Sequence, residues 1–132
     1  MITVIKSPFV QYKLTILRNK KTSNTVFRQT MNEISYLIAS DVLQYVPFKK
    51  QTIETPLKKM SGTALGQPII LVPILRAGLG LLEGFAKFLP EAEKGHIGLY
   101  RDEQTYEPVE YLFKLPRVKN KKVLILDPML AT

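Results

Sequence analysis

Residues 121–132 read Lys121-Lys122-Val123-Leu124-Ile125-Leu126-Asp127-Pro128-Met129-Leu130-Ala131-Thr132. The four aliphatic residues from Val123 to Leu126 predict a short strand buried on both faces, as in the middle of a parallel sheet. An acid follows this strand at once, and open α/β sheets bind ligands beyond the carboxyl ends of their strands. We therefore expect Asp127 to lie at the edge of a binding site.

The small residues after this strand are typical of a phosphate-binding loop. Ala131 and Thr132 allow the backbone to pass close to a phosphate, with a hydroxyl and backbone N–H groups as donors. The glycines that usually turn such a loop into a helix do not occur up to Thr132, so we expect only the first half of the loop. The alternative is an ordinary core strand that ends in an Asp-Pro turn, and this stretch alone does not decide between the two.

A second buried strand is predicted at residues 69–72, within the segment Pro68-Ile69-Ile70-Leu71-Val72-Pro73-Ile74-Leu75-Arg76-Ala77-Gly78-Leu79-Gly80. A helix is predicted to follow at residues 81–89. Between them, Arg76 offers a bidentate guanidinium, and the backbone of Ala77 and Gly78 can approach an anion closely. The alternative is a strand-to-helix turn whose glycines serve packing, with Arg76 in a surface ion pair.

Two amphipathic helices are predicted within residues 7–45. Ser7 and Pro8 suit the start of the first helix, in which Phe9, Tyr12 and Ile16 recur at helical spacing. The second begins after residues 23–25 and ends before Pro47. Its apolar stripe is expected to face the core and consists of Phe27, Met31, Ile34, Ile38 and Val42. Residues 49–66 alternate weakly, which predicts an edge hairpin or an irregular excursion without visible chemistry.

Residues 97–115 predict two strands joined by a polar loop at residues 102–107, forming an arm that projects from the sheet. The first strand ends at Arg101. The second is expected to place four residues on one apolar face: Val109, Tyr111, Phe113 and Leu115. Such a face must be buried on its own domain or on a partner subunit. His96 lies outside the polar loop, and we interpret it as a structural strand residue rather than a catalytic base.

Composition limits the class of protein. The chain has 132 residues, no cysteine, one histidine and a formal net charge of +8, which excludes a disulfide framework and any multi-histidine metal centre. We expect one cytoplasmic domain without a membrane span, because no apolar run approaches the ~20 residues that a span needs. The lysines occur as scattered pairs without interleaved aromatic residues, so we expect a solvated surface rather than nucleic-acid binding.

Four segments, taken together in this order, resemble uracil phosphoribosyltransferase. They are residues 73–79, Pro-Ile-Leu-Arg-Ala-Gly-Leu; residues 98–105, Gly-Leu-Tyr-Arg-Asp-Glu-Gln-Thr; residues 107–111, Glu-Pro-Val-Glu-Tyr; and residues 126–132, Leu-Asp-Pro-Met-Leu-Ala-Thr. Any one segment is weak evidence, but their joint order makes chance implausible. The resemblance covers essentially the whole chain, which corresponds to about the first three-fifths of a typical member.

The resemblance implies a type I phosphoribosyltransferase fold, an α/β protein with a parallel sheet flanked by helices and a projecting β-arm, incomplete at the C-terminus. It implies pieces at residues 7–45, 68–89, 97–115 and 123–132. Members of this family join uracil to phosphoribosyl pyrophosphate (PRPP) to give uridine monophosphate (UMP) and pyrophosphate. They usually require Mg²⁺, which arrives with PRPP, and they work as homodimers or higher oligomers in which the arm contributes to the interface.

By the same resemblance, Arg76 lies in the pyrophosphate loop with Ala77 and Gly78, and Arg101 also reaches the pyrophosphate. Asp127 begins the loop that holds the ribose and its 5'-phosphate, which continues through Pro128, Met129, Leu130, Ala131 and Thr132. The chemistry agrees with these roles, because displacement of pyrophosphate builds positive charge on the ribose ring and negative charge on the leaving group. Fixed arginines and Mg²⁺ stabilise that separation, and no covalent nucleophile is needed.

The family pattern extends beyond this chain. The phosphate loop of the family continues with two glycines and a small hydroxyl residue, and its uracil pocket comes from a segment near the C-terminus. We therefore expect the 132 residues to be inactive alone. Two other hypotheses stay open: a non-catalytic oligomerisation module that keeps the arm, and a small basic nucleic-acid-binding protein, which only the net charge favours.

Overall fold

The computed structural model describes residues 2–129, and all statements about the structure refer to these residues. The helices and strands along the chain are α1 (Pro8–Arg18), α2 (Asn24–Val42), the 3-10 turn η1 (Leu43–Tyr45), β1 (Phe48–Glu54), β2 (Lys59–Leu65), β3 (Ile69–Leu75), α3 (Leu79–Phe88), β4 (Glu93–Lys94), β5 (His96–Arg101), β6 (Pro108–Lys114) and β7 (Lys122–Leu126). Two sheets are present, one of two strands and one of five. Within residues 2–129, none of the helices combines the length and apolar character that a membrane crossing requires.

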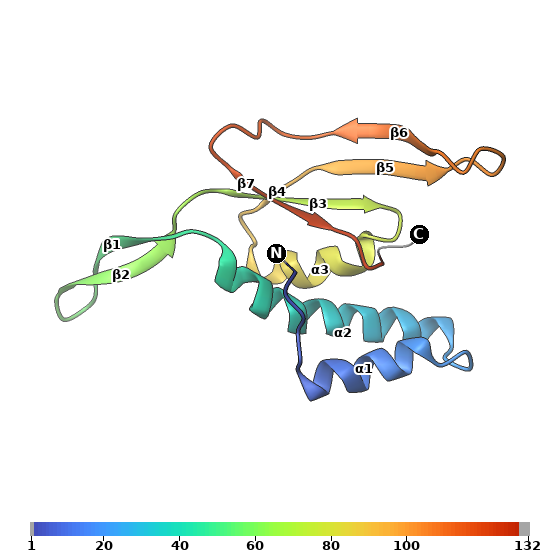
Figure 1. The fold of residues 1–132 in the computed structure, drawn as a ribbon. Coiled ribbons are helices and arrows are strands. Elements are labelled where there is room, and N and C mark those ends of the chain that lie inside the picture. Colours follow the sequence, from blue (N-terminus) through green and yellow to red (C-terminus); the bar gives the residue numbers. More distant parts are fainter. Residues whose placement is uncertain (1, 130–132) are drawn as a thin grey trace.

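Strand β3 forms the centre of the larger sheet. Strand β7 pairs with it in parallel on one side, from Ile69↔Lys122 to Pro73↔Leu126. Strands β4 and β5 also pair with β3 in parallel, and β6 continues the sheet antiparallel to β5. In Figure 1 the three helices lie together on one side of this sheet, with α3 nearest to it and α1 farthest. The predicted α/β class, with a parallel sheet covered by helices, is confirmed.

The core lies between β3 and the helices α2 and α3. Leu71 of β3 is fully buried, and Leu81 and Phe85 of α3 and Ala39 of α2 pack in the same cluster. Helix α2 approaches α3 closely at Gly84, where an added Cβ would lie 1.9 Å from Ser35 Oγ. The apolar stripe predicted for α2 is present, although Phe27 at its start is 41% exposed.

The N-terminal helices begin as the sequence predicts. The side chains of Ser7 and Ser23 accept hydrogen bonds from the first turns of α1 and α2, which satisfies helix N–H groups that lack a partner within the helix. On α1, however, Val10 is the buried residue, whereas Phe9 and Tyr12 are more than half exposed. Both rings instead contact the ammonium group of Lys13. Its Nζ lies 5.4 Å from the centroid of the Phe9 ring and 5.5 Å from that of the Tyr12 ring.

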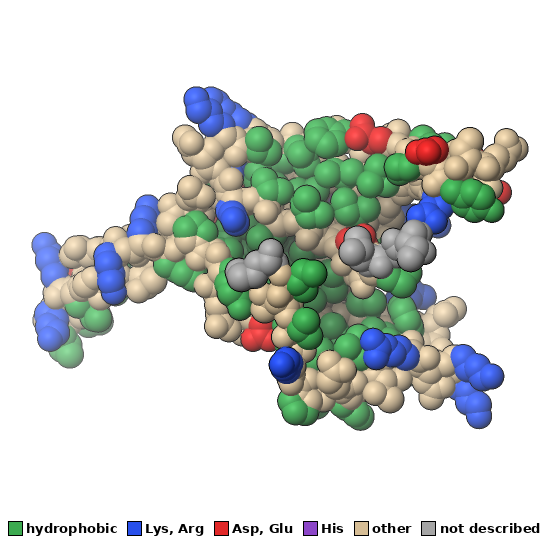
Figure 2. Space-filling view, in the orientation of Figure 1, with side chains coloured by type: hydrophobic (Ala, Val, Ile, Leu, Met, Phe, Trp, Pro, Cys, Tyr) green, Lys and Arg blue, Asp and Glu red, His purple; other side chains and the backbone are tan. Residues whose placement is uncertain are grey.

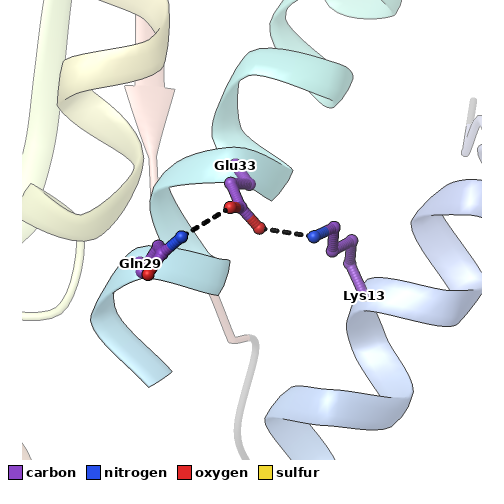
Figure 3. A network of polar contacts seen from close by, with 3 residues as sticks. All are labelled: Lys13, Gln29 and Glu33. Carbon is purple, nitrogen blue, oxygen red and sulfur yellow. Dashed lines mark hydrogen bonds and ion pairs between the residues drawn. The ribbon is translucent and has the colours of Figure 1, made fainter. Parts of the chain in front are cut away.

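Lys13 also joins α1 to α2 (Figure 3). Its Nζ lies 2.6 Å from Glu33 Oε2, and Gln29 donates to Glu33 Oε1 at 3.1 Å. These two contacts, the bond from Lys13 first, lower the pKa of Glu33 below its ordinary value. The contact therefore aligns the outer helix with α2 through charge as well as packing.

The prediction for the strand that ends at Leu126 was wrong in one respect. Leu126 is buried, but β7 lies at the edge of the sheet within residues 2–129, and Ile125 is 63% exposed. The four-residue aliphatic run predicted burial on both faces, yet only the face toward α3 is covered in the described part of the chain. The parallel pairing itself agrees with the prediction.

Residues 48–65 form the predicted hairpin. Strands β1 and β2 pair from Phe48↔Leu65 to Glu54↔Lys59 and make the separate two-stranded sheet. Every residue of β1 is exposed. In Figure 1 this hairpin extends away from the body of the molecule, on the side opposite to the loop that joins β5 to β6.

Strands β5 and β6 form the predicted arm, but the single apolar face on β6 was wrong. The register shifts between Gly98↔Leu112 and Leu99↔Glu110, which leaves Tyr111 without a paired residue, as in a β-bulge. A one-residue insertion reverses the alternation of side chains, so Val109 and Leu112 are half-buried, while Tyr111 and Phe113 are exposed. His96 is a half-buried strand residue, as expected.

Candidate active site

The carboxyl ends of β3 and β7 meet at one edge of the sheet. The pairing Pro73↔Leu126 places the end of β7 two residues before the end of β3, because the strands run in parallel. Asp127 follows β7 and Arg76 follows β3, so the two charged residues leave neighbouring strands at the same edge. This is the position at which open α/β sheets bind their ligands.

The turn from β3 into α3 folds back onto the end of β7. The N–H of Gly78 donates to the Ile74 carbonyl at 2.7 Å, and the Leu75–Arg76 peptide bond is cis. A Cβ added at Gly78 would lie 2.3 Å from the carbonyl oxygen of Leu126 and 2.6 Å from the backbone nitrogen of Ile74. Only glycine fits this approach, which holds residues 76–78 beside the residue that follows Leu126.

The site is open and carries unpaired charge. Arg76, Ala77 and Asp127 are exposed, and the ion pairs found among residues 2–129, Lys13–Glu33 and Lys121–Glu93, involve none of them. The surface ion pair considered for Arg76 is therefore not formed with any described residue. A guanidinium in this state can bind a phosphate in a bidentate manner.

The backbone N–H groups at this turn point to two different uses. The N–H groups of Leu79, Gly80 and Leu81 donate to the carbonyls of residues 76–78. None of these turn bonds uses the N–H groups of Arg76 and Ala77, which precede the first turn of α3. Donors of this kind, next to an arginine, suit an oxyanion.

Arg101 lies farther from these residues along the arm. Leu75 at the end of β3 pairs with Gly98, and β5 continues for three residues beyond that level, or about 10 Å at the usual rise per residue. The structure thus brings Arg76, Ala77, Gly78 and Asp127 together and leaves Arg101 at the outer end of the same edge. Pro128 is half-buried and Met129 is 71% exposed, whereas the predicted loop residues Leu130, Ala131 and Thr132 lie outside the described part of the chain.

Asp102, which the sequence analysis did not single out, organises the tip of the arm. Its Oδ1 accepts hydrogen bonds from the N–H groups of Thr105 at 2.8 Å and Gln104 at 2.9 Å, and from the hydroxyl of Thr105 at 3.1 Å. These bonds, the one from the Thr105 backbone first, lower the pKa of Asp102. The signal in the sequence was the Asp-x-x-Thr spacing of an Asx-type turn directly after Arg101.

The ordering of this tip is expected to depend on pH. Because the folded pKa of Asp102 is lowered, its carboxylate stabilises the turn above the unfolded value of about 4, and this contribution is lost as the pH falls through the lowered pKa. We expect the protection of the Gln104 and Thr105 amides, measured as the exchange rate relative to the intrinsic rate at the same pH, to fall below about pH 4. Asp102→Asn keeps an acceptor but cannot titrate, so it should remove this pH response; an unchanged response in the variant would contradict the assignment.

Two cavities of the molecule lie away from this edge. One of about 480 Å³ is lined by residues 3–7 and by the end of α2 and the turn that follows it. The other, of about 400 Å³, lies between the base of the β1–β2 hairpin and the end of α3, near the start of β3. None of the residues predicted for the site lines either cavity.

The residues at this edge define the class of protein. A parallel sheet whose strands end in an arginine loop and an acid is typical of α/β proteins, which bind ligands in the crevice beyond the carboxyl ends of their strands. More specifically, the chain belongs to the uracil phosphoribosyltransferase family, whose model matches residues 4–132.

Individual relatives agree with this membership. A uracil phosphoribosyltransferase of Levilactobacillus brevis is 47% identical to this chain over 131 residues. One of Streptococcus mutans is also 47% identical over 131 residues. A solved structure of an Aquifex aeolicus protein has a TM-score of 0.90 and 35% identity, covering 100% of this chain and 64% of that one. The match to the Levilactobacillus relative covers 98% of this chain but 63% of the relative. The chain thus spans less than two thirds of the length of the proteins that it matches.

Proposed function

We propose that this chain carries the PRPP-binding part of a uracil phosphoribosyltransferase, which transfers phosphoribosyl from PRPP to uracil and releases UMP and pyrophosphate. The observation that carries the proposal is the loop of residues 76–78, which Gly78 allows to lie against the end of β7 beside Asp127. Family membership and the names of the relatives supply the reaction.

The pyrophosphate is assigned to the arginine loop. Arg76 binds it through the guanidinium, and the N–H groups of Arg76 and Ala77 approach it from the backbone. Arg101 meets the same group from the arm, which requires the ligand to extend outward along the edge of the sheet. Both cations stabilise the negative charge that develops as the bond to the anomeric carbon breaks.

Asp127 is assigned to the ribose. Its exposed carboxylate, next to the arginine loop, accepts hydrogen bonds from ribose hydroxyls directly or through water. The residues that follow, from Pro128 to Thr132, begin the loop for the 5'-phosphate. An acid at this position also favours the positive charge that develops on the ribose ring in the transition state.

We propose that Mg²⁺ enters with PRPP rather than through a protein site. No group of three or more metal-binding side chains is found among residues 2–129, and Asp127 is the carboxylate that leaves β7 at this edge. Mg²⁺ commonly retains several waters and is bound through one or two carboxylates together with substrate phosphates, so this donor set fits. The bound ion would supply neutralisation of charge on the pyrophosphate, and Asp127 would hold the ribose hydroxyls directly or through water.

The family also suggests a compartment and an oligomeric state for the protein. We propose that the protein acts in the cytoplasm in pyrimidine salvage, as a homodimer or higher oligomer. Exposed aromatic residues on the arm, among them Tyr111 and Phe113, support an interface there. The other two candidate functions, an interaction module and a nucleic-acid binder, have no observation at the sheet edge in their favour.

The test is UMP formation by a chimera in which residues 1–132 replace the matched region of the Levilactobacillus brevis relative. We expect Mg²⁺-dependent formation of UMP from uracil and PRPP, because the chimera combines this PRPP site with the rest of a family member. The control is the relative itself, and folding is checked by circular dichroism. A folded chimera that forms no UMP would contradict the proposal.

The same assay tests the expectation that residues 1–132 are inactive by themselves. The match covers 63% of the relative, so more than a third of that protein lies outside it, and by family resemblance the uracil pocket belongs to a later segment. We expect no detectable UMP from the 132-residue polypeptide under conditions in which the chimera is active. Turnover by that polypeptide would show that the later segment is dispensable.

A further inference from the structure

The net charge of the chain is concentrated toward the amino-terminal end of β3. Three segments lie there: the β1–β2 hairpin with its link to β3 (residues 48–68), β4 (residues 93–94) and the connection from β6 into β7 (residues 114–122). They contain ten basic and two acidic residues, whereas the rest of the chain contains nine of each, so they account for the whole net charge of +8. Figure 2 shows Lys and Arg side chains gathered on the hairpin and above it at the same end of the molecule. The basic residues are Lys49, Lys50, Lys58, Lys59, Lys94, Lys114, Arg117, Lys119, Lys121 and Lys122, and the acids are Glu54 and Glu93.

The connection from β6 to β7 is the most basic of these segments. Residues 114–122 contain five basic residues and no acid. The connection ends at Lys122, which pairs with Ile69 at the start of β3. It also passes close to β4, because a Cβ added at Gly95 would lie 2.5 Å from Leu115 Cδ2. The cation of β4 therefore joins this surface, and we name the following residues the basic edge: Lys94, Lys114, Arg117, Lys119 and Lys122.

The charges of the basic edge are exposed and not neutralised by the described part of the chain. All five residues are solvent-exposed. The ion pairs found among residues 2–129 are Lys13–Glu33 and Lys121–Glu93, and neither includes a residue of the basic edge. Cations gathered in this way repel one another and create a positive potential, which attracts a polyanion.

A defined turn lies in the middle of the connection. The N–H of Lys121 donates to the Val118 carbonyl at 3.1 Å, and Asn120 has a φ of 61°, a left-handed conformation that asparagine tolerates better than most residues. The N–H of Lys122 then donates to the Pro68 carbonyl at 2.9 Å. The turn is thus tied to the sheet and holds its side chains in a fixed arrangement.

This turn combines charge with an aliphatic side chain. Val118 is 46% exposed and lies between the exposed residues Arg117 and Lys119. Nucleic acids and anionic membranes both carry the complementary charge, but single-stranded nucleic acids also bind to aromatic platforms, and residues 114–122 contain no aromatic residue. A bilayer accepts aliphatic side chains at the boundary of headgroups and acyl chains, while neighbouring Lys and Arg groups remain at the headgroups. The composition of the turn therefore favours a lipid surface.

We propose that the basic edge binds the surface of a bilayer that contains anionic phospholipids. Val118 enters the headgroup region, and Arg117 and Lys119 contact lipid phosphates on either side of it. The other cations of the basic edge add attraction over about one Debye length. Strand β3, with seven residues, separates the start of the sheet from its carboxyl edge by about 20 Å, so Arg76 and Asp127 stay accessible. The proposal is therefore independent of the reaction proposed above.

Co-sedimentation of the 132-residue polypeptide with vesicles tests the proposal. We expect binding to phosphatidylcholine vesicles with about 30% phosphatidylglycerol, and binding weaker by about tenfold or more to phosphatidylcholine alone. Raising NaCl from about 0.1 M to about 1 M shortens the range of the attraction from ~10 Å to ~3 Å, so it should weaken binding to a similar degree. Absence of binding to the anionic vesicles at low salt, with folding checked by circular dichroism, would overturn the proposal.

Charge reversal shows whether the basic edge makes the contact. We expect Arg117→Glu with Lys119→Glu to weaken binding to the anionic vesicles by about tenfold or more. Lys20→Glu with Lys21→Glu, in the turn between α1 and α2, is the matched control, because it changes the net charge by the same amount. This control should bind nearly as the unchanged chain does. Equal losses in the two variants would assign binding to net charge alone and overturn the proposal.

A tryptophan reporter locates the contact independently of charge. The chain has no tryptophan, so Val118→Trp and Tyr12→Trp, the latter on α1, each introduce a single indole. The emission of Val118→Trp should shift to shorter wavelength on anionic vesicles, because the indole leaves water for the headgroup region, and that of Tyr12→Trp should not. The reverse pattern would overturn the proposal. Binding of poly(U) that Arg117→Glu with Lys119→Glu abolishes, without binding to vesicles, would also overturn it and assign the basic edge to nucleic acid.

Discussion

Replacing Arg76 with alanine in the active chimera is expected to lower kcat/KM for PRPP by about 100- to 1000-fold. Arg76 is exposed at the carboxyl edge of the sheet, and it makes no ion pair with residues 2–129, so its guanidinium is available to the pyrophosphate. Its effect is greatest in the transition state, where the leaving group carries the most negative charge. Steady-state rates of UMP formation at varied PRPP concentration measure this loss.

Two further variants show whether the loss reflects binding geometry. Arg76→Lys keeps the charge but loses the bidentate fork, so we expect an intermediate decrease. Arg18→Ala removes a basic residue from the end of α1, away from the site, and should leave the rate unchanged. If Arg76→Ala behaved like Arg18→Ala, Arg76 would have no role at the pyrophosphate.

Replacing Gly84 with alanine is expected to destabilise the fold by about 2–3 kcal/mol, because the added Cβ would enter the closest contact between α2 and α3. It would lie 1.9 Å from Ser35 Oγ, 2.5 Å from the Ser35 carbonyl carbon and 2.6 Å from the backbone nitrogen of Tyr36. Two of these atoms belong to the backbone, so a change of side-chain rotamer does not relieve the clash. The helices must separate, and a decrease in melting temperature of roughly 10 °C is expected by thermal denaturation.

Gly62→Ala is the matched control for this substitution. Its Cβ would lie 3.4 Å from the nearest atom, Ile53 Cδ1, in the exposed hairpin, which is an ordinary contact. The melting temperature should therefore change little or rise slightly, since alanine also reduces the entropy of the unfolded chain. Equal effects at the two positions would show that the approach of α2 to α3 is not constrained by Gly84.

Local sequence patterns predicted most of the fold. The aliphatic runs of β3 and β7, the Ser-Pro start of α1 and the alternation in the hairpin are signals that act within a few residues. The loop at Arg76 followed from the same reasoning, because an arginine and small residues directly after a buried strand must lie at the carboxyl edge of the sheet. Its closeness to Asp127 then required only that the two strands be parallel neighbours, which they are.

The remaining features depend on contacts between distant segments. Phe9 and Tyr12 have helical spacing, but which face of α1 is buried depends on α2, and it is the face of Val10. The bulge at Tyr111 arises from pairing with β5, where the Tyr111 ring occupies the space above Gly98, so the period-two pattern of β6 alone could not reveal it. The edge position of β7 within residues 2–129 likewise depends on which strands join the sheet rather than on the strand itself.

The sequence motif that contains Arg101 does not predict how far this residue lies from the arginine loop. The resemblance assigned both arginines to the pyrophosphate, whereas the register of β5 against β3 places Arg101 about 10 Å beyond the end of β3. Whether Arg101 and Arg76 contact the same ligand therefore depends on the path of the arm. Asp102 fixes that path at the tip, where it accepts hydrogen bonds from the N–H groups of Gln104 and Thr105. Sequence alone specifies the residue but not this distance.

The central claim is that the loop of residues 76–78 and Asp127 form one PRPP site, and the most direct test is calorimetric titration of the chimera with PRPP and, separately, with pyrophosphate. We expect Arg76→Ala to weaken binding of both ligands by at least tenfold in the presence of Mg²⁺. Asp127→Asn should weaken binding of PRPP while leaving that of pyrophosphate nearly unchanged, because Asp127 is assigned to the ribose. Wild-type affinity for both ligands in both variants would contradict the account.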